Sequence, residues 1–377
     1  MEQADIVIVG AGIVGATLAW NLRDSGLDVI IVDRAEPGGA TTNSTFAWMN
    51  ASSKVRRGYG PDYVRLSVDG WCDAYELALE IPGDWMHVTG NLEVVAADQA
   101  AALEGDVRRL VGQGYLTQYL DPERLAARYP ELVVDEGSAA AWYPDEGWID
   151  GPALVTDIAR RLEGGNVSFR TGDVVGFDQD GGSARVTSVR LASGERIRTG
   201  QVVVTAGVWT ADIAALAGVT VPMAARADAS VPGIVARATA PADGLRHQIM
   251  GGGDDFVVRP HRPGEIMLTG EGHGLELTAD TSPEEALRGA EALLTVAAKT
   301  VPALRDCDVT SATVCLRALP ADGVSITGAD ADVPNLYVAV THSGISLAPT
   351  LGKFIAAELL SGRPEEALEP FRLARFR

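Results

Sequence analysis

The sequence predicts an α/β fold made of two interleaved domains, one of which contains a parallel sheet. A short β-branched run, a glycine-rich turn and a helical pattern follow one another at three distant places, 6–40, 201–217 and 337–360. Such strand–turn–helix units are typical of parallel sheets with helices on their faces. Different β-rich stretches separate the three places. We therefore expect distant segments to join one sheet and the intervening chain to build a second, sheet-based domain.

Length and charge limit the classes of protein to which the chain can belong. Its 377 residues suggest two or three domains at about 150 residues each. The net charge is −20, from 31 Lys and Arg against 51 Asp and Glu. Such a surface repels phosphate backbones and anionic lipids, so we expect neither a nucleic-acid partner nor a membrane partner.

The cysteines and the first apolar stretch indicate in which cellular compartment the protein is located. The three cysteines form no C-x-x-C pair, which fits a reducing compartment, and no zinc-ligand spacing is visible, so no metal is expected. The apolar stretch 6–22 follows Glu2 and Asp5, where a signal peptide needs positive charge. We expect a cytoplasmic protein.

The first strand–turn–helix unit contains a phosphate-binding pattern. Ile6–Val9 predicts a buried strand, and Gly10, Gly12 and Gly15 follow in the spacing G-x-G-x-x-G at the start of a helix. The first glycine permits a tight turn, the second lets the backbone approach a pyrophosphate, and the third lets the helix pack closely on the strand. Dinucleotide binding is favoured over a purely structural glycine turn because strand, turn and helix occur in this order.

The next strand adds an acid to this pattern. Val29–Val32 predicts a second buried strand, and Asp33 stands at its end, about 20 residues after the glycines, where it can accept from a ribose hydroxyl. An acid there disfavours a 2′-phosphorylated nicotinamide cofactor but does not separate NAD from FAD. The interleaved organisation suits a large ligand held by several distant segments.

The remaining elements are predicted in chain order. The stretch 36–53, rich in Gly, Ser, Thr and Asn, predicts a loop over a ligand. Ser282, followed by proline, predicts a helix start. The predicted helices are 62–79, 100–112, 122–128, one from about 152, 282–294 and a last one ending near 362; the predicted strands are 90–96, a meander of 167–177, 184–191 and 195–198, and strand-like stretches at 233–240 and 255–270.

Five stretches in order carry a family resemblance. They are "VIVGAGIVGATLAWNLRDSGLDVIIVDRAEPGGAT", "DEGWIDGPALVTDIARRL", "VVVTAGVWT", "LRALPADGVSITG" and "THSGISLAPTLGKFIAAELL". Together they resemble the FAD-dependent amine and amino-acid oxidoreductases, the family of D-amino acid oxidase, glycine oxidase and sarcosine oxidase. The resemblance implies a Rossmann-like FAD-binding domain formed by 1–60, 145–217 and 311–377, and a β-sheet-based substrate domain formed by 61–144 and 218–310.

The resemblance also implies which residues hold the FAD. They are Gly10, Gly12, Ile13, Val14, Gly15, Asp33, Arg34, Ala40, Thr41, Thr42, Val174, Ala206, Gly207, Trp209, Cys315, Gly344, Ile345 and Ser346.

Arg317 and Cys315 lie in the stretch "TVCLRALPADG". By resemblance to glycine oxidase, Arg317 binds the substrate carboxylate, a task that suits its forked guanidinium; an internal salt bridge is the alternative, and Ala318 stands where the family pattern has proline. Cys315 occupies the place where sarcosine oxidase carries its covalent flavin thioether. A small buried cysteine without such a bond is the alternative.

Two histidines are candidate catalytic groups. His342 precedes a predicted helix start that the resemblance places beside the flavin ring; it is a base, a substrate donor, or a packing or capping residue. Sarcosine oxidase has a lysine near the flavin where this chain has Leu268 or Thr269. His273 is the nearby cationic candidate in its place, and an ordinary loop residue is the alternative.

Other clusters leave a functional and a structural interpretation open. The stretch "KVRRGYG" carries Lys54, Arg56, Arg57 and Tyr59; it guides an anionic substrate or forms a solvated turn. Trp48 and Met49 are expected to pack in the core or on the cofactor. The aromatic set lines a pocket or belongs to the core, and its members are Trp142, Tyr143 and Trp148.

These observations predict an FAD enzyme that transfers a hydride from a small polar substrate to flavin N5. The first hypothesis is oxidation of an amino acid or secondary amine to an imine, with O2 or another electron acceptor as the second substrate. The alternative is oxidation of a sugar or other alcohol, with His342 or His273 as the base. A non-catalytic flavin-binding subunit and an NAD-dependent dehydrogenase are the remaining hypotheses.

Overall fold

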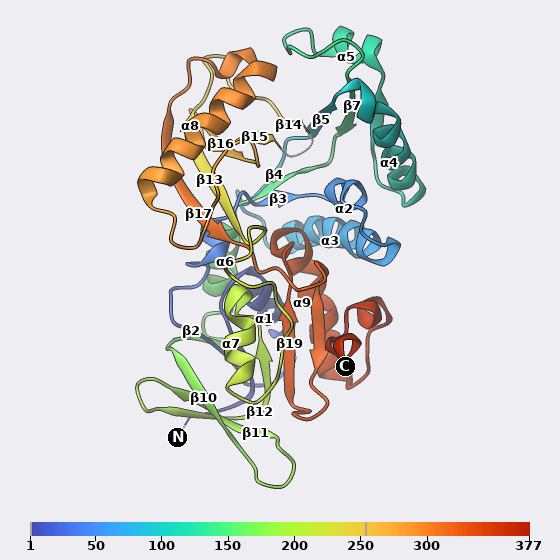
Figure 1. Cartoon of the computed structure of the whole chain (residues 1–377). Helices are drawn as coiled ribbons and strands as arrows, with labels where there is room; N and C mark the ends of the chain where they lie inside the picture. The colour runs from blue at the N-terminus through green and yellow to red at the C-terminus, as the bar shows by residue number, and fades with distance from the viewer. Residues whose placement is uncertain (1, 253–254) are drawn as a thin grey trace.

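The computed structural model describes residues 2–252 and 255–377. In Figure 1 a lower body holds the parallel strands and both chain ends, and an upper body holds a second sheet with helices around it. The chain passes between the two bodies repeatedly, as the mixed colours of each body show. The predicted α/β class is confirmed.

The lower body is built on a sheet with β1 (Glu2–Val9) near its centre. Strand β1 pairs in parallel with β2 (Val29–Asp33) on one side and with β12 (Arg196–Val204) on the other. Val9 stands beside both Val32 and Val204, so apolar residues distant in sequence bury each other. The sheet is completed by β9 (Val167–Thr171), β10 (Val174–Gln179), β11 (Val186–Leu191), β18 (Ile326–Ala329) and β19 (Leu336–Val340).

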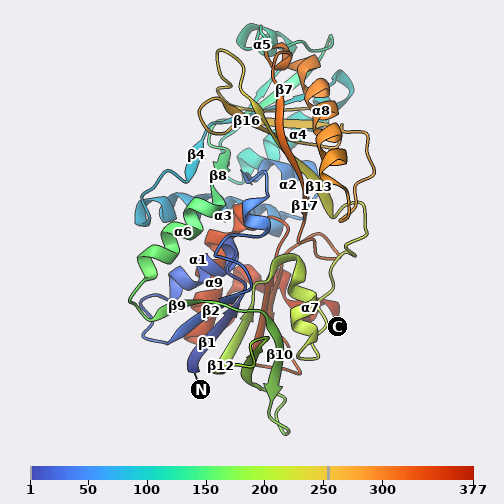
Figure 2. The ribbon, with the colours of Figure 1, turned by 90° about the vertical axis from the view of Figure 1, so that its left-hand side faces the viewer.

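Helices cover both faces of this sheet (Figure 2). One face carries α1 (Ile13–Leu22), α6 (Gly151–Leu162) and α9 (Gly344–Ser361), and the other carries α7 (Thr210–Ala215). Helices α1 and α9 approach closely at Gly352, where a Cβ would lie 2.7 Å from the carbonyl carbon of Thr17.

The upper body is a sheet in the order β17-β13-β16-β15-β14-β5-β7-β6. Its strands are β5 (Asn91–Val95), β6 (Gln118–Leu120), β7 (Ala139–Tyr143), β13 (Pro232–Thr239), β14 (Gln248–Gly251), β15 (Phe256–Pro260), β16 (Glu265–Thr269) and β17 (Val309–Leu316). Three helices pack on it, namely α4 (Ala100–Gly112), α5 (Pro122–Arg128) and α8 (Pro283–Thr300).

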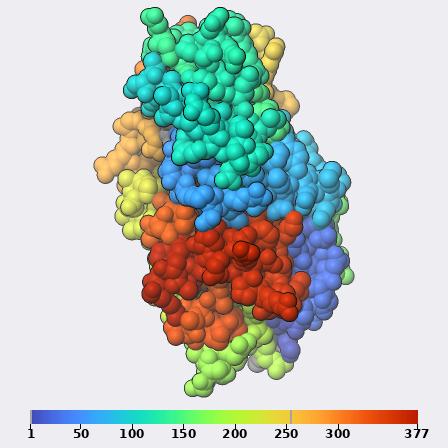
Figure 3. Space-filling model, turned by 90° about the vertical axis from the view of Figure 1, so that its right-hand side faces the viewer, coloured from blue at the N-terminus to red at the C-terminus, as the bar shows by residue number. Residues whose placement is uncertain are grey.

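A small sheet and two helices lie between the bodies. The sheet consists of β3 (Trp48–Met49), β4 (Met86–Val88) and β8 (Gly147–Ile149). The helices are α2 (Ser52–Arg56) and α3 (Pro61–Glu80). Figure 3 shows the blue band of this region between the teal upper body and the red C-terminal segment.

Most predicted elements are confirmed, and some differ. The strand-like stretch predicted at 255–270 forms two strands, β15 and β16, joined by a turn. The strands predicted at 195–198 and from 201 are one strand, β12, since Thr199 and Gly200 continue it. The strand predicted at 167–177 is interrupted at Gly172. Its first half, β9, pairs with β2 and is therefore not part of the predicted meander. Helix α8 starts at the predicted cap, Ser282, but runs on to Thr300, just before Pro302.

Two elements, α3 and β17, do not follow the predicted domain boundaries. Helix α3, assigned by its sequence position to the substrate domain, packs on α9 of the lower body. Strand β17 pairs with β13 in the upper sheet, so the boundary at 310/311 falls inside a strand. The division into two functional domains stays a prediction.

Candidate functional site

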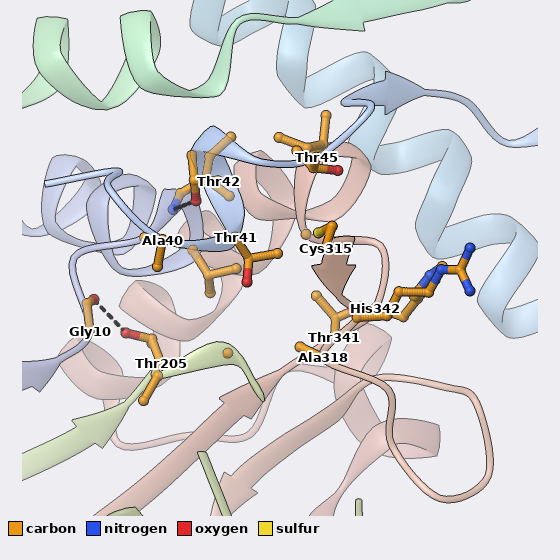
Figure 4. Close-up of a pocket in the computed structure, with 18 of the residues that line it drawn as sticks. Gly10, Ala40, Thr41, Thr42, Thr45, Thr205, Cys315, Ala318, Thr341 and His342 are labelled. Atoms are coloured by element: carbon orange, nitrogen blue, oxygen red, sulfur yellow. Dashed lines mark hydrogen bonds between the residues drawn. The ribbon is translucent and has the colours of Figure 1, made fainter. Parts of the chain in front are cut away.

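A cavity of about 450 Å³ extends from the glycine turn of the lower body to the underside of the upper sheet. Figure 4 shows it with Gly10 and Thr205 at one side, Thr41 and Thr42 in the middle, and Cys315 and His342 at the other. The cavity thus has two ends, which we call the Asp33 end and the His342 end. Loops after parallel strands meet here because the carboxyl ends of such strands share one edge of a sheet.

Close packing at the glycine turn places the start of α1 at the cavity wall. Gly10 has φ +118°, and a Cβ there would lie 2.6 Å from the carbonyl oxygen of Thr205. A Cβ on Gly15 would lie 2.0 Å from the carbonyl oxygen of Gly10, so only glycine allows the helix to approach. Gly12 has no side chain to cap the helix, the Ile13 N–H donates to the Thr42 hydroxyl at 3.1 Å, and the first turn holds no acid. Such a helix start favours an anionic group.

Asp33 is fixed at the end of β2 beside this turn. Its Oδ2 accepts from the Ala11 N–H at 2.7 Å, and its Oδ1 accepts from the Ala35 N–H at 2.9 Å. Asp33 lines the cavity, and the neighbouring Arg34 guanidinium lies 4.1 Å from the Trp209 ring centre. A carboxylate in this place suits the ribose hydroxyls of a dinucleotide whose phosphates face the helix start.

Most of the residues predicted to hold the cofactor surround this one cavity. Gly15 does not line it and acts through packing instead. The predicted residues that line the cavity are Gly10, Gly12, Ile13, Val14, Asp33, Arg34, Ala40, Thr41, Thr42, Val174, Ala206, Gly207, Trp209, Cys315, Gly344, Ile345 and Ser346.

Cys315 and Arg317 lie at the His342 end. Burial raises the pKa of the Cys315 thiol, which therefore stays protonated near neutral pH. Arg317 lines the cavity and donates from one guanidinium nitrogen to the carbonyl oxygens of Ser230 and Pro232, at 3.0 and 3.2 Å. Its other terminal nitrogen lies 4.0 Å from Glu271. The two interpretations of Arg317 thus coexist, because it faces the cavity and also has an acidic neighbour.

The two candidate histidines are placed differently. His342 lines the cavity, and burial together with Arg317, Lys54 and Arg57 lowers its pKa to about 3. It is therefore a neutral imidazole near pH 7 and a weak base. His273 is not among the residues that line the cavity; its Nδ1 accepts from the Leu275 N–H at 3.1 Å. The structure does not bring His273 to the site, because its turn leads away toward α8.

The basic cluster is solvated only in part, because Arg57 is exposed whereas Lys54 is buried. Lys54 is only 6% exposed, and it lines the cavity together with Arg57 and Tyr59. Arg56 faces the other way, with its Nε 3.3 Å from the buried Glu93 carboxylate. Thr269 also lines the cavity, whereas its neighbour Leu268 is buried in the upper core.

The aromatic residues divide between the cavity and the core. Trp48 lines the cavity, whereas Met49 is fully buried in the core. Trp142, Tyr143 and Trp148 are not among the residues that line the cavity, and each packs elsewhere. The Tyr143 hydroxyl donates to Glu93 at 2.9 Å, and the Trp148 ring stacks on His87. The pocket interpretation of these three aromatic residues is therefore wrong.

A buried carboxylate that the sequence did not single out organises α2. Glu146 is fully buried and accepts four hydrogen bonds. Its Oε1 accepts from the Tyr115 hydroxyl at 2.9 Å and from the Ser52 N–H at 3.2 Å. Its Oε2 accepts from the Asn91 amide at 3.0 Å and from the Trp48 indole at 3.1 Å. Glu146 thereby holds the cavity residue Trp48 and the start of α2, the helix that carries Lys54.

The described residues show neither a metal cluster nor a membrane-spanning helix. Among residues 2–252 and 255–377, no group of three His, Cys, Asp or Glu side chains could hold a metal ion. No helix in the same ranges is long and apolar enough to cross a membrane.

Comparisons with known proteins show the family to which the chain belongs. Glycine oxidase of Pseudomonas aeruginosa is 25% identical over 390 residues, covering 97% of this chain and 96% of that protein. Mouse FAD-dependent oxidoreductase domain-containing protein 1 is 26% identical over 256 residues, which span 58% of this chain and 50% of that protein. The crystal structure of glycine oxidase from Geobacillus kaustophilus superposes with a TM-score of 0.84 at 21% identity, over 100% of this chain and 99% of that one. Residues 5–358 match the DAO family, described as FAD dependent oxidoreductase. The chain belongs to this family of FAD-dependent oxidoreductases.

Proposed function

We propose that the chain holds FAD in the cavity and oxidises the C–N bond of a small amino acid or secondary amine to an imine. The glycine turn and Asp33 fit the adenosine diphosphate half, and the start of α9 at 344–346 fits the ring half. FAD supplies the acceptor for the hydride that leaves the substrate carbon. The protein binds the substrate, orients its C–H bond and excludes water.

The observation that carries this proposal is the charge at the His342 end. Lys54, Arg57 and Arg317 all line the cavity, and all three lower the pKa of His342. A chain with a net charge of −20 therefore places two guanidinium groups, those of Arg317 and the exposed Arg57, at one end of its cavity. Such a place suits a substrate carboxylate. Two of the similar proteins carry the name glycine oxidase, which supports an amino-acid-type substrate.

The two histidines do not supply the base that the alcohol-oxidation hypothesis assigns to them. That reaction needs a base for the O–H proton, and a base works best when its pKa lies near the working pH. The His342 imidazole has a pKa of about 3, so it is too weak a base near pH 7. His273 does not line the cavity.

Anaerobic reduction of the purified flavoprotein tests the substrate class. The protein is mixed with panels of amino acids, secondary amines and sugars while the flavin absorbance is followed. We expect bleaching by at least one amine that carries a carboxylate and none by sugars. Bleaching by sugars alone would overturn the proposal, and no bleaching by any compound would favour a non-catalytic flavin-binding subunit.

We further propose that FAD is held without a covalent bond to Cys315. A thioether needs a reactive thiolate, and burial keeps this thiol protonated. Acid precipitation is expected to leave the yellow colour in the supernatant, and Cys315→Ala is expected to keep its flavin. Colour in the wild-type pellet that disappears in Cys315→Ala would contradict this prediction.

A further inference from the structure

Lys54 is a buried lysine at the wall of the cavity. It lies in the five-residue helix α2 and is 6% exposed. Its Nζ donates to the Ser53 hydroxyl at 3.1 Å, and this hydroxyl donates to the Asn50 side-chain oxygen at 2.6 Å. Among the described residues no carboxylate forms an ion pair with Lys54. An ammonium in this place thus lacks the partner that buried charges usually have.

Burial and the surrounding charges allow Lys54 to be either protonated or neutral near pH 7. Burial, Arg57 and Arg56 disfavour the ammonium, whereas Glu146 favours it, and the pKa of Lys54 falls to about 7. Glu146 is already engaged by four donors, so it acts on Lys54 only at a distance. The lysine is therefore largely a neutral amine at slightly alkaline pH.

The other charged groups around α2 do not provide a titrating group at the cavity wall. Glu93, on β5, pairs with Arg56 and accepts from Tyr143. Asp106, on α4, lies close to Arg109. His342 faces the same cavity but stays neutral. Lys54 is thus the group at this end of the cavity that can gain and lose a proton near pH 7.

An amine substrate needs such a group. An aliphatic amine is mostly protonated near pH 7, and an ammonium nitrogen has no lone pair to assist the loss of hydride from the neighbouring carbon. Resting on the proposed function, we propose that Lys54 is the base that removes the proton from the substrate ammonium. The N–H bond of the ammonium breaks and its electron pair stays on the substrate nitrogen. The proton binds the lone pair of Nζ and later passes to water.

Two variants separate a base from a positive charge. Lys54→Met removes both, whereas Lys54→Arg keeps the charge but gives no proton acceptor. For both variants we expect anaerobic flavin reduction by an amine to be about 100-fold slower at pH 7, a typical share for a positioned base. The deficit should close as the pH passes the pKa of the substrate amine, which then arrives neutral. Lys299→Met, at a lysine on α8 outside the cavity, should behave as wild type.

The outcomes distinguish this proposal from the proposed function. A fast Lys54→Arg enzyme, or a deficit in Lys54→Met that is the same at every pH, would overturn the base role and indicate a carboxylate anchor. If wild type responds to amines and Lys54→Met is undiminished at pH 7, only the base role fails. If no amine reduces wild type, the proposed function fails and the base role with it.

Thermal unfolding gives a measure that does not depend on turnover. The folded-state pKa of Lys54 lies below its unfolded value of 10.5, so the unfolded chain binds more protons between about pH 7 and pH 10.5. Wild type should therefore gain stability relative to Lys54→Met as the pH rises through this window, and the difference should stay constant below pH 7. A difference in melting temperature that is flat across the window would contradict a titrating, buried lysine.

Discussion

Replacing Gly15 with alanine is expected to strip the protein of most of its flavin. The new Cβ would lie 2.0 Å from the carbonyl oxygen of Gly10 and 2.8 Å from the Thr205 hydroxyl. Gly10 cannot retreat, because its own Cα already faces the backbone of Thr205. The start of α1 must therefore move away from the sheet, and its N–H groups move with it. Overpacking of this kind costs about 1–3 kcal/mol, or about 10–100-fold in affinity for FAD.

The measurement is the ratio of flavin to protein after purification, followed by titration of the apoprotein with FAD. Gly105→Ala is the matched control, because a Cβ on Gly105, within α4, would meet no atom within 4 Å. That variant should keep its flavin and gain up to about 1 kcal/mol from helix propensity. Equal flavin content in Gly15→Ala and Gly105→Ala would show that the close approach of helix and strand is not needed.

The second large effect is expected at Glu146, although this residue does not line the cavity. Alanine there would leave four donors without their acceptor, among them the buried Ser52 N–H and the partly buried Trp48 indole. At about 1–3 kcal/mol for each orphaned donor, with partial relaxation, we expect a loss of about 3–5 kcal/mol in the free energy of unfolding. The variant would also remove the carboxylate that raises the pKa of Lys54.

Urea unfolding of the flavoprotein measures the loss in the free energy of unfolding of Glu146→Ala. Glu291→Ala, at an exposed residue on α8, serves as the control and should change stability by no more than about 0.5 kcal/mol. Loss of the Glu146 charge should lower the pKa of Lys54. The pH midpoint of any remaining amine-dependent flavin reduction should therefore lie below that of wild type. If Glu146→Ala unfolds at the same urea concentration as Glu291→Ala, the network around Glu146 carries little stability.

The parts of the site that the sequence predicts are those that local chemistry defines. The turn at Gly10, the start of α1 and the position of Asp33 after β2 all follow from one continuous stretch of strand, turn, helix and strand, 6–33. Three separated flavin segments could be assembled because each has the same strand–turn–helix pattern. The prediction divides β12 at 199–200 because Gly200 is typical of a turn, although the strand continues through it, and it ends α8 too early because no Gly or Pro at 295–300 marks the end.

The rest depends on contacts between distant segments. The sequence around Lys54 shows a basic cluster but not which side chain is buried. That burial follows from a helix held by Glu146, a residue more than 90 positions away. Likewise, His342 and His273 both precede a Ser or Gly, yet only His342 follows a strand of the parallel sheet, β19, and reaches the cavity.

The pairing of β1 with β12 and of β12 with β19 has a consequence for synthesis on the ribosome. Val9 stands beside Val204, and Val204 stands beside Val338, so the central sheet joins strands that emerge far apart in time. A nascent chain that has released β1, α1 and β2 still lacks the neighbours that bury β1. Long-range pairing of this kind slows folding and leaves apolar edges exposed in the meantime. The central sheet therefore cannot be completed until the strand at 336–340 has been synthesised.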